Sequence, residues 1–348
     1  MRPLSDFPRI ELAHRPTPLE PMPNLSRLLG GPSLLVKRDD CTGLAMGGNK
    51  VRQLEFYFGD AVEKGATTVL ITGAVQSNYV RTVAAAAAKL GLGCHIQLED
   101  RVPGMGEVYH GSGNVLLDRL LGAHLHTYPE GEDEAGADRA LAGIAARLKE
   151  RGERPYLIYL SEEHEPLGAL GYVDAAAEIM RQAEQMQVSL TTIVLASGGG
   201  ATHAGMLVGL RDLGRDDIAV HGICVRRGRD AQRERIVRVV RKTEELLDCV
   251  GVVRENEVLV NDDFLGTGYG RPTESGTEAM LLVGRTEGLL LDPVYTGKAF
   301  AGFLDLVRRG AVGSEPIVFL HTGGTPALFA YGPEVLEAVP GVEGAVGS

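Results

Sequence analysis

Short apolar runs rich in Val, Ile and Leu alternate along this chain with longer segments whose apolar residues recur near helical spacing. The short runs predict β-strands, and the longer segments predict α-helices. The predicted strands are residues 34–37, 67–72, 95–98, 124–128, 156–160, 191–196, 219–225 and 317–320. The predicted helices are residues 50–64, 80–92, 114–121, 133–151, 172–186, 202–213, 231–250, 274–287 and 297–309, with a last helix from residue 326.

Strands that alternate with helices form parallel sheets with helices on both faces. Because these strands are too many for one comfortable sheet, the sequence predicts an α/β fold with two doubly wound, mostly parallel sheet lobes. We expect residues 1–48 and 164–348 to form a larger lobe and residues 49–163 a smaller one. The active site is expected in the cleft between them, at carboxyl ends of strands. Residues 1–33, which are rich in proline, are expected to be an irregular lead that wraps a surface.

Composition and charge exclude several classes of partner. The net charge of the 348 residues is −11 and no dense basic cluster is present, so we expect no nucleic-acid partner. No apolar run is long enough to span a membrane, and the first residues lack the apolar core of a signal peptide, so we expect a cytoplasmic protein. No metal site is predicted, because the nine histidines form no ligand pattern and the cysteines are scattered as reduced thiols at Cys41, Cys94, Cys224 and Cys249.

A stretch in the first quarter of the chain combines a lysine with an anion site. Gly47-Gly48-Asn49 allows close approach of the backbone to a bound group and places Lys50 at the start of a helix. A cation there opposes the helix dipole, which disfavours the alternative of an ordinary surface lysine. The strand 67–72 is followed by Gln76-Ser77-Asn78 at the next helix start, where N–H groups favour an anion. An amine beside such a site indicates Schiff-base chemistry on a carboxylate-bearing substrate.

A phosphate site is predicted at Ser197-Gly198-Gly199-Gly200-Ala201-Thr202, between an apolar strand and a helix. Backbone N–H groups of glycine runs hold phosphate at this place, and a simple tight turn rarely needs three glycines. Gly198 and Gly200 match a dinucleotide fingerprint, and Arg226-Arg227 follow the next strand, where an NADP phosphate could bind. His203 occupies the third fingerprint position, so a single small phosphate fits better. An NADP-binding oxidoreductase stays the competing class.

Four residues in turns are open to both a functional and a structural interpretation. Tyr269 and Tyr295 lie in glycine-flanked turns and are candidate proton donors or substrate clamps, against ordinary packed tyrosines. Thr322 follows the final strand and could hydrogen-bond a cofactor ring, although Thr is common in strands for its β-propensity. His164 lies in an acidic loop at a strand end, where a solvated histidine is the more common outcome.

Five motifs occur in order along the chain: KRDDCTGLAMGGNKVRQLE, GAVQSNYVR, SGGGATHAG, LLLDPVYTGKAFAG and HTGG. They resemble motifs of the D-cysteine desulfhydrase and 1-aminocyclopropane-1-carboxylate (ACC) deaminase family, a branch of the fold type II pyridoxal-phosphate (PLP) enzymes. The resemblance implies PLP as the cofactor, a small amino acid as the substrate and a homodimer. It also implies a role for each matching residue: Lys50 binds PLP covalently, Asn78 contacts the ring hydroxyl, residues 197–202 hold the phosphate, Ser77 and Tyr295 face the substrate, Tyr269 is the second active-site tyrosine, and Thr322 lies near the pyridine nitrogen.

The resemblance implies β-elimination, in which D-cysteine gives pyruvate, ammonia and sulfide. ACC deamination to 2-oxobutyrate and L-cysteate sulfo-lyase activity are the alternatives. ACC deaminases similar to this chain carry a glutamate near the pyridine nitrogen where this chain has Thr296. A neutral residue leaves that nitrogen less protonated, which favours simple elimination over ring opening.

Two departures from the desulfhydrase pattern bear on the substrate. Tyr79 replaces the usual His or Gln beside the expected substrate carboxylate, and the loop SEEHEPLGALGY is closer to that of ACC deaminases. Tyr79 and His164 are therefore candidate substrate contacts. The acidic residues of this loop would oppose the extra anion of L-cysteate.

Overall fold

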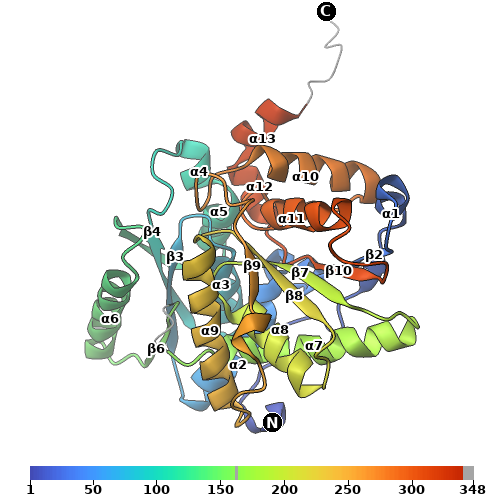
Figure 1. Ribbon diagram of the computed structural model, residues 1–348. Helices are drawn as coiled ribbons and strands as arrows, with labels where there is room; N and C mark the ends of the chain where they lie inside the picture. The colour runs from blue at the N-terminus through green and yellow to red at the C-terminus, as the bar shows by residue number, and fades with distance from the viewer. Residues whose placement is uncertain (161–163, 340–348) are drawn as a thin grey trace, which may run out of the picture.

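The computed structural model describes residues 1–160 and 164–339, and in this part of the chain the strands form two separate sheets (Figure 1). The larger sheet has the strand order β1-β2-β10-β7-β8-β9, and its neighbouring strands are parallel except for the antiparallel pair β1 and β2. Its strands are β1 (Leu19–Pro21), β2 (Leu34–Lys37), β7 (Thr192–Ser197), β8 (Ala219–Cys224), β9 (Leu259–Asn261) and β10 (Ile317–Leu320).

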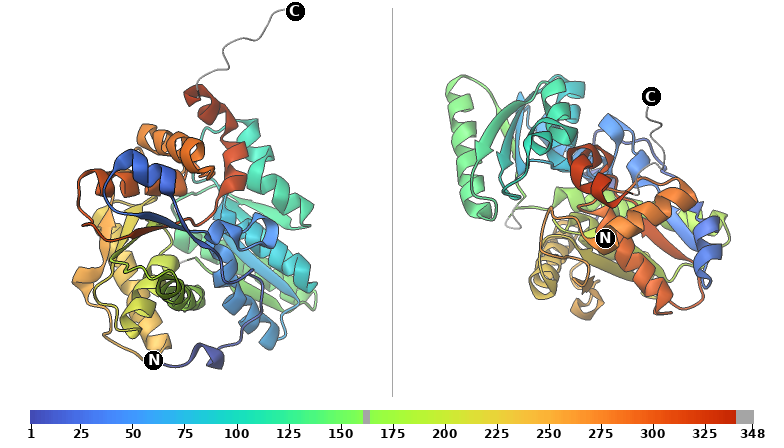
Figure 2. Two further views of the ribbon diagram at one scale, coloured as in Figure 1. Left: turned by 90° about the vertical axis from the view of Figure 1, so that its right-hand side faces the viewer. Right: turned by 90° about the horizontal axis from the view of Figure 1, so that it is seen from above.

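The smaller sheet is parallel throughout and has the strand order β5-β4-β3-β6. Its strands are β3 (Thr68–Ala74), β4 (Gly93–Glu99), β5 (His124–Tyr128) and β6 (Pro155–Ile158). Figure 2 shows the elements of the two sheets as two lobes side by side. The predicted α/β fold with two parallel-sheet lobes is confirmed, and the lobe boundaries at residues 48, 49, 163 and 164 stay a prediction.

Helices cover both faces of the larger sheet. On one face lie α1 (Pro23–Leu29), α10 (Glu274–Glu287) and α11 (Thr296–Arg308), and on the other lie α7 (Leu167–Gln185), α8 (Ala201–Asp212) and α9 (Arg229–Leu246). Neighbouring residues of a strand point to opposite faces, so a fully apolar strand supplies both cores. In β10, Ile317 and Phe319 join the first core, whereas Val318 and Leu320 join the second.

The smaller sheet is packed in the same way. Helices α2 (Asn49–Glu63), α3 (Asn78–Leu90) and α5 (Gly113–Leu120) lie with the core on one face, and α6 (Glu134–Glu150) covers the other. Val69 and Ile71 of β3 enter the first core, whereas Leu70 packs against α6. The remaining helices are α4 (Glu107–Gly111), α12 (Thr325–Ala330) and α13 (Gly332–Ala338), with short 3-10 turns at Leu4–Asp6, Asp39–Cys41, Leu44–Met46 and Glu255–Glu257.

The first 33 residues are more regular than expected. Strand β1 pairs antiparallel with β2, and α1 follows with Pro23 at its first position. Proline is tolerated on an edge strand and at the first position of a helix, so the prolines here position regular elements. Strand β9 was also not predicted, because its three half-buried residues give too short a pattern.

Helix α7 begins at Leu167, whereas the sequence predicted a start at residue 172. Gly168 and Gly171, which precede the predicted start of the helix, let α7 approach α2 closely. A Cβ atom on Gly168 would lie 3.0 Å from Cβ of Gln53, and one on Gly171 would run into the backbone carbonyl of Arg52. The helical glycines therefore mark a close helix contact, which a single sequence does not separate from a helix stop.

Three findings concern membrane spans, metals and cysteines. Residues 1–160 and 164–339 contain no helix that is long and apolar enough to cross a membrane. The same residues contain no group of three or more His, Cys, Asp or Glu side chains that could hold a metal ion. All four cysteines are free thiols, and Cys94, Cys224 and Cys249 are buried.

Candidate active site

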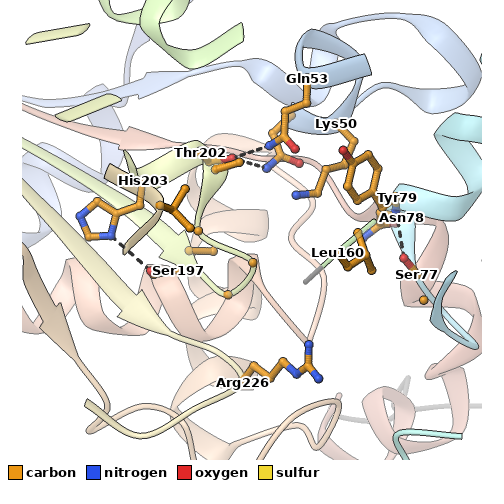
Figure 3. Close-up of a pocket in the computed structure, with 18 of the residues that line it drawn as sticks. Lys50, Gln53, Ser77, Asn78, Tyr79, Leu160, Ser197, Thr202, His203 and Arg226 are labelled. Carbon is orange, nitrogen blue, oxygen red and sulfur yellow. Dashed lines mark hydrogen bonds between the residues drawn. The ribbon is translucent and has the colours of Figure 1, made fainter. Parts of the chain in front are cut away.

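One pocket is lined by fourteen of the residues that the sequence singled out for the site (Figure 3). Its walls come from both lobes, at the carboxyl ends of strands β3, β7 and β10. The starts of α2 and α3, which pack on the smaller sheet, contribute the first four residues of the set, and later segments of the chain contribute the other ten. The residues are Lys50, Ser77, Asn78, Tyr79, His164, Ser197, Gly198, Gly199, Gly200, Ala201, Thr202, Tyr269, Tyr295 and Thr322.

Lys50 lies in the first turn of α2, directly after two glycines with positive φ. Gly47 has φ 65° and Gly48 has φ 113°, and a Cβ atom on Gly47 would run into the carbonyl oxygen of Asp40. The Asn49 amide donates to the Thr322 carbonyl at 3.0 Å, which joins the start of α2 to the end of β10. These contacts hold the backbone of Lys50 at the pocket wall.

The amine of Lys50 lies over the ring of Tyr79, with Nζ 4.8 Å from the ring centroid. Within residues 1–160 and 164–339 it makes no hydrogen bond and no ion pair. Burial lowers the pKa of Lys50 to about 8, so a sizeable part of the amine is neutral near pH 7.5. A neutral, unpaired amine is a nucleophile ready for a carbonyl carbon.

The glycine loop joins β7 to α8, and the carbonyls of its first two glycines are hydrogen-bonded to side chains of α9. The Gly198 carbonyl accepts a hydrogen bond from Gln232 at 3.1 Å, and the Gly199 carbonyl accepts one from Arg235 at 3.0 Å. Gly200 is the N-cap of α8 with φ 109°, and no side chain caps the helix. The first amides of a helix have no partner within the helix, so this end is suited to an anion.

Thr202 in the first turn of α8 is tied to the lysine-bearing helix. Its hydroxyl oxygen accepts hydrogen bonds from Asn49 and from Gln53, both at 2.9 Å (Figure 3). The glycine loop and α2 are therefore held in one rigid arrangement, although they belong to parts of the chain about 150 residues apart. Figure 3 shows Lys50 between Thr202 on one side and Asn78 and Tyr79 on the other.

His203 occupies the third fingerprint position, and helix α8 still packs closely on the larger sheet. Its Nδ1 lies 3.2 Å from the Ser197 hydroxyl, and its ring packs where a Cβ atom on Gly222 of β8 would stand. The glycine that allows close packing is therefore on the neighbouring strand. Arg226 and Arg227, the candidates for an NADP phosphate, both pair with Glu134 of α6.

The turn after β3 forms the opposite wall of the pocket. The Ser77 hydroxyl caps α3 by accepting hydrogen bonds from the amides of Tyr79 at 3.2 Å and Val80 at 3.4 Å. Asn78 Oδ1 accepts a hydrogen bond from Asn114 at 3.1 Å, which orients the side-chain amide. Capping explains the serine structurally, and it leaves the hydroxyl proton of Ser77 and the Nδ2 atom of Asn78 able to donate.

Tyr269 and Tyr295 meet in the pocket, and their hydroxyl oxygens are 2.6 Å apart. Burial raises the pKa of both hydroxyls above the usual value, and for Tyr295 well above it. Both tyrosines are therefore neutral at pH 7, and the pair can donate a proton. The Asp292 carboxylate positions Tyr295 by accepting a hydrogen bond from its amide at 2.9 Å.

Thr296 does not line the pocket, in contrast to the expectation that residue 296 lies near the pyridine nitrogen. It is fully buried, and its hydroxyl donates to Asp292 Oδ1 at 2.7 Å and accepts from the Asp292 amide at 2.8 Å. The turn before α11 needs this hydroxyl for its own hydrogen bonds. The neutral residue at position 296 therefore acts on the turn that carries Tyr295.

His164 lines the pocket mouth, stacked on Tyr159 with ring centroids 3.7 Å apart. Its Nε2 lies 3.9 Å from Asp138 Oδ2. Residues 161–163 of the predicted loop lie outside the described residues, whereas Glu165 lines the pocket.

Three arginines, Arg101, Arg226 and Arg235, line the pocket and were missed as site residues. Arg101 follows β4, and Arg226, considered only for NADP, follows β8. Both lie just past the carboxyl end of a parallel strand, which is where ligands bind in α/β folds. That position was a usable signal, but charged residues after strands are too common for it to be selective.

The chain is similar to known proteins over most of its length. Residues 10–323 match the model of a family described as "Pyridoxal-phosphate dependent enzyme". The chain is 42% identical over 333 residues to a D-cysteine desulfhydrase of Salmonella typhi, covering 95% of this chain and 98% of the relative. It is similar to the solved structure of an ACC deaminase homologue with a TM-score of 0.86 and 39% identity, covering 97% of this chain and 98% of that one. A fungal L-serine ammonia-lyase from Rhizomucor miehei, with a TM-score of 0.65 and 18% identity over 94% of this chain and 98% of that one, shares the fold.

Proposed function

Because this chain belongs to the family of pyridoxal-phosphate-dependent enzymes, we propose that it is a lyase that carries out β-elimination on D-cysteine, releasing pyruvate, ammonia and sulfide. The 42% identity to a D-cysteine desulfhydrase over nearly the full length of both chains supports this substrate. The cofactor is PLP, as in the rest of the family.

The observation that carries the proposal is the placement of a free amine and an anion site in one pocket. Lys50 offers a partly neutral amine without a hydrogen bond among the described residues. Across the pocket, the start of α8 offers uncapped amides from a loop whose carbonyls are bound elsewhere. These groups fit PLP, whose aldehyde reacts with an amine and whose phosphate needs N–H donors.

Six polar side chains of the pocket have a proposed task. When bound, PLP supplies an electron sink for negative charge at the substrate Cα. The Nδ2 atom of Asn78 would donate to the cofactor ring, and the Thr322 hydroxyl would hydrogen-bond the ring nitrogen. Ser77, at the start of α3, would bind the substrate carboxylate. Lys50 would hold the proton taken from Cα, and Tyr295 with Tyr269 would face the substrate side chain.

The choice between D-cysteine and ACC does not depend on a hydroxyl of residue 296 near the ring, since Thr296 is bound to Asp292. What supports elimination is a hydroxyl, Thr322, and not a carboxylate, at the pocket end of β10. A hydroxyl hydrogen-bonds the ring nitrogen without holding it protonated. Such a site favours substrates with a good β-leaving group.

We also propose that the enzyme works in the cytosol as a homodimer. Four free cysteines support a reducing compartment. Helices α5 and α12 pack together, and large apolar side chains on them are exposed, such as Leu120 at 73% and Phe329 at 60%. Exposed apolar residues on adjacent helices support a subunit contact. Light scattering of the purified protein tests the oligomeric state.

The decisive experiment is a substrate comparison with the purified, PLP-loaded protein. D-cysteine, L-cysteine, L-cysteate and ACC are offered in turn, and pyruvate and 2-oxobutyrate are measured. We expect pyruvate and sulfide from D-cysteine and little 2-oxobutyrate from ACC. Faster formation of 2-oxobutyrate from ACC than of pyruvate from D-cysteine would show an ACC deaminase, and sulfite release from L-cysteate would show a sulfo-lyase.

A further inference from the structure

Arg101 brings a buried positive charge to the pocket. It follows strand β4 of the smaller sheet, and its side chain is only 6% exposed. A guanidinium is always charged near neutral pH and carries five N–H donors. Burying it is favourable only when anions or hydrogen-bond acceptors surround it.

The partners of Arg101 satisfy only one edge of the guanidinium. Nε donates to Glu99 Oε2 at 2.8 Å, and Nη2 lies 2.7 Å from the same oxygen. Glu99 is in turn fixed by Thr72, whose hydroxyl donates to Oε1 at 2.7 Å. Nη2 is buried and makes no well-formed hydrogen bond, and no hydrogen bond of Nη1 is found within the described residues. The carboxylate therefore orients the guanidinium and leaves donors for another acceptor.

The charge of Arg101 acts on the tyrosine pair. It lowers the pKa of both Tyr269 and Tyr295, against the larger effect of burial, which raises them. All three residues line the same pocket, and Val102, next to Arg101, packs against Gly270, next to Tyr269, so Arg101 and the two hydroxyls form one cluster in the pocket wall. This cluster combines a fixed positive charge with neutral proton donors, which is a combination that stabilises an anion.

We propose that Arg101 stabilises the negative charge that the sulfur atom acquires as the substrate Cβ–S bond breaks, and so makes the pocket select substrates whose β-substituent leaves as a basic anion. This inference rests on the proposed function. The Cα–H and Cβ–S bonds break, a Cα–Cβ double bond forms, and the Cβ–S electron pair leaves with sulfur as hydrosulfide. The Cα proton goes to Lys50, and one water then hydrolyses the C–N bond to give pyruvate and ammonia.

Two substrates with the same Cα chemistry and different leaving groups test this role. Chloride is a much weaker base than hydrosulfide, so its departure from β-chloro-D-alanine needs little stabilisation. In Arg101→Gln we expect kcat/KM to fall about 100-fold for D-cysteine, the size of effect seen for one donor to a developing anion, and far less for β-chloro-D-alanine. Arg101→Lys, which keeps the charge, is expected to recover part of the D-cysteine activity.

A second pocket arginine provides the matched control. Arg226 is ion-paired with Glu134 at 2.8 Å and Glu132 at 3.3 Å. Arg226→Gln is expected to change kcat/KM by the same factor for D-cysteine and for β-chloro-D-alanine. The visible absorbance of bound PLP and the Tm are measured for each variant, so that a folding defect is recognised. An equal loss of both activities in Arg101→Gln, or no loss, would overturn the role of Arg101 alone. If the wild-type protein forms pyruvate from neither substrate, the proposed function is wrong and this inference with it.

Discussion

Two lysines near helix α2, Lys37 and Lys50, have opposite environments. On the side of α2 that faces α7, Lys37 donates from Nζ to the Thr17 carbonyl at 2.7 Å, to Glu178 at 2.6 Å and to Gln182 at 2.6 Å. On the side of the pocket, the amine of Lys50 has no hydrogen bond among the described residues and lies against the Tyr79 ring. The buried Lys37 has all its hydrogen bonds satisfied, whereas the partly buried Lys50 is left reactive.

Arg52, two residues after Lys50, completes the satisfied region. It is fully buried and donates to both oxygens of Asp39 at 2.9 Å and to Glu178 at 2.7 Å and 3.1 Å. Asp39 also accepts hydrogen bonds from Thr17 at 2.7 Å and Tyr172 at 2.6 Å. This network ties α2 to the larger sheet and to α7. A fully satisfied network of buried hydrogen bonds can therefore hold a helix rigidly while a lysine on the same helix stays free to react.

The largest expected effect comes from removing the free lysine. Lys50→Ala should abolish turnover and the visible absorbance of bound PLP, because it removes the amine that is proposed to bind the cofactor covalently. Lys298 is the control, since burial lowers its pKa to about 8 as well, but its Nζ donates to the carbonyls of Leu265 at 2.8 Å and Gly268 at 2.9 Å. Absorbance scans of both variants decide. A band that survives in Lys50→Ala and vanishes in Lys298→Ala would contradict the assignment.

Arg52→Ala should be the most destabilising change in the satisfied network. It leaves the carboxylates of Asp39 and Glu178 buried without their main partner, which costs about 3–5 kcal/mol. Urea unfolding measures the loss. Lys64→Ala removes an ion pair with Asp60 in which the lysine side chain is 64% exposed, and it should cost at most about 1 kcal/mol. Similar costs for the two variants would show that the network does not hold α2.

The network should also make stability depend on acid. Burial alone would raise the pKa of Glu178, but the hydrogen bond and charge of Arg52 and then the charge of Lys37 lower it from 4.5 to about 2. A depressed pKa in the folded state stabilises the protein above pH 4.5, and this contribution is lost as the pH falls towards 2. At ~1.4 kcal/mol per pH unit the effect is about 3 kcal/mol. The free energy of unfolding of Glu178→Gln, measured across this pH range, should not show this decrease. A variant that loses as much stability in acid as the wild-type protein would contradict the prediction.

A smaller effect is expected in the phosphate loop, where the glycines are not equivalent. Gly200 has φ 109° and a Cβ atom there would lie 3.3 Å from Val239, whereas a Cβ atom on Gly199 would meet nothing within 4 Å. Gly200→Ala should therefore lower PLP affinity through a strain of about 1–3 kcal/mol, and Gly199→Ala should change it much less. Titration of the PLP-free protein with PLP gives both values. The reverse order would show that the turn is not shaped as described.

The smallest expected effect concerns Thr296. Thr296→Val removes two hydrogen bonds with Asp292 and should cost about 1–2 kcal/mol, with the ratio of pyruvate to 2-oxobutyrate unchanged. Thr296→Ser keeps the hydroxyl and is the control. Thr296→Glu would bring a second carboxylate to Asp292 and should destabilise more, without a gain of ACC activity. A shift towards 2-oxobutyrate in any of these variants would restore residue 296 as a determinant of the reaction.

Local patterns in the sequence were enough to predict most of the elements in their order, and the motifs of the site. A strand that ends in Gly198-Gly199-Gly200 before a helix, and a lysine after two glycines, carry their meaning within a few residues. Helix α10, strands β5 and β10 were predicted with their observed bounds, because apolar periodicity and turn residues are local properties.

The tertiary structure decided which side chains meet. The contact between Tyr269 and Tyr295, the tie of Thr202 to Gln53, and the early start of α7 against α2 all join residues far apart in the chain. Whether a residue such as Thr296 points into the pocket or away from it is decided by partners like Asp292 that become neighbours only through the turn they share. Arg101 became a pocket residue for the same reason, because its position depends on how β4 of one lobe faces the other lobe. The periodicity of apolar residues shows which face of a helix or strand is buried, whereas catalysis depends on which side chains of other elements meet in the pocket.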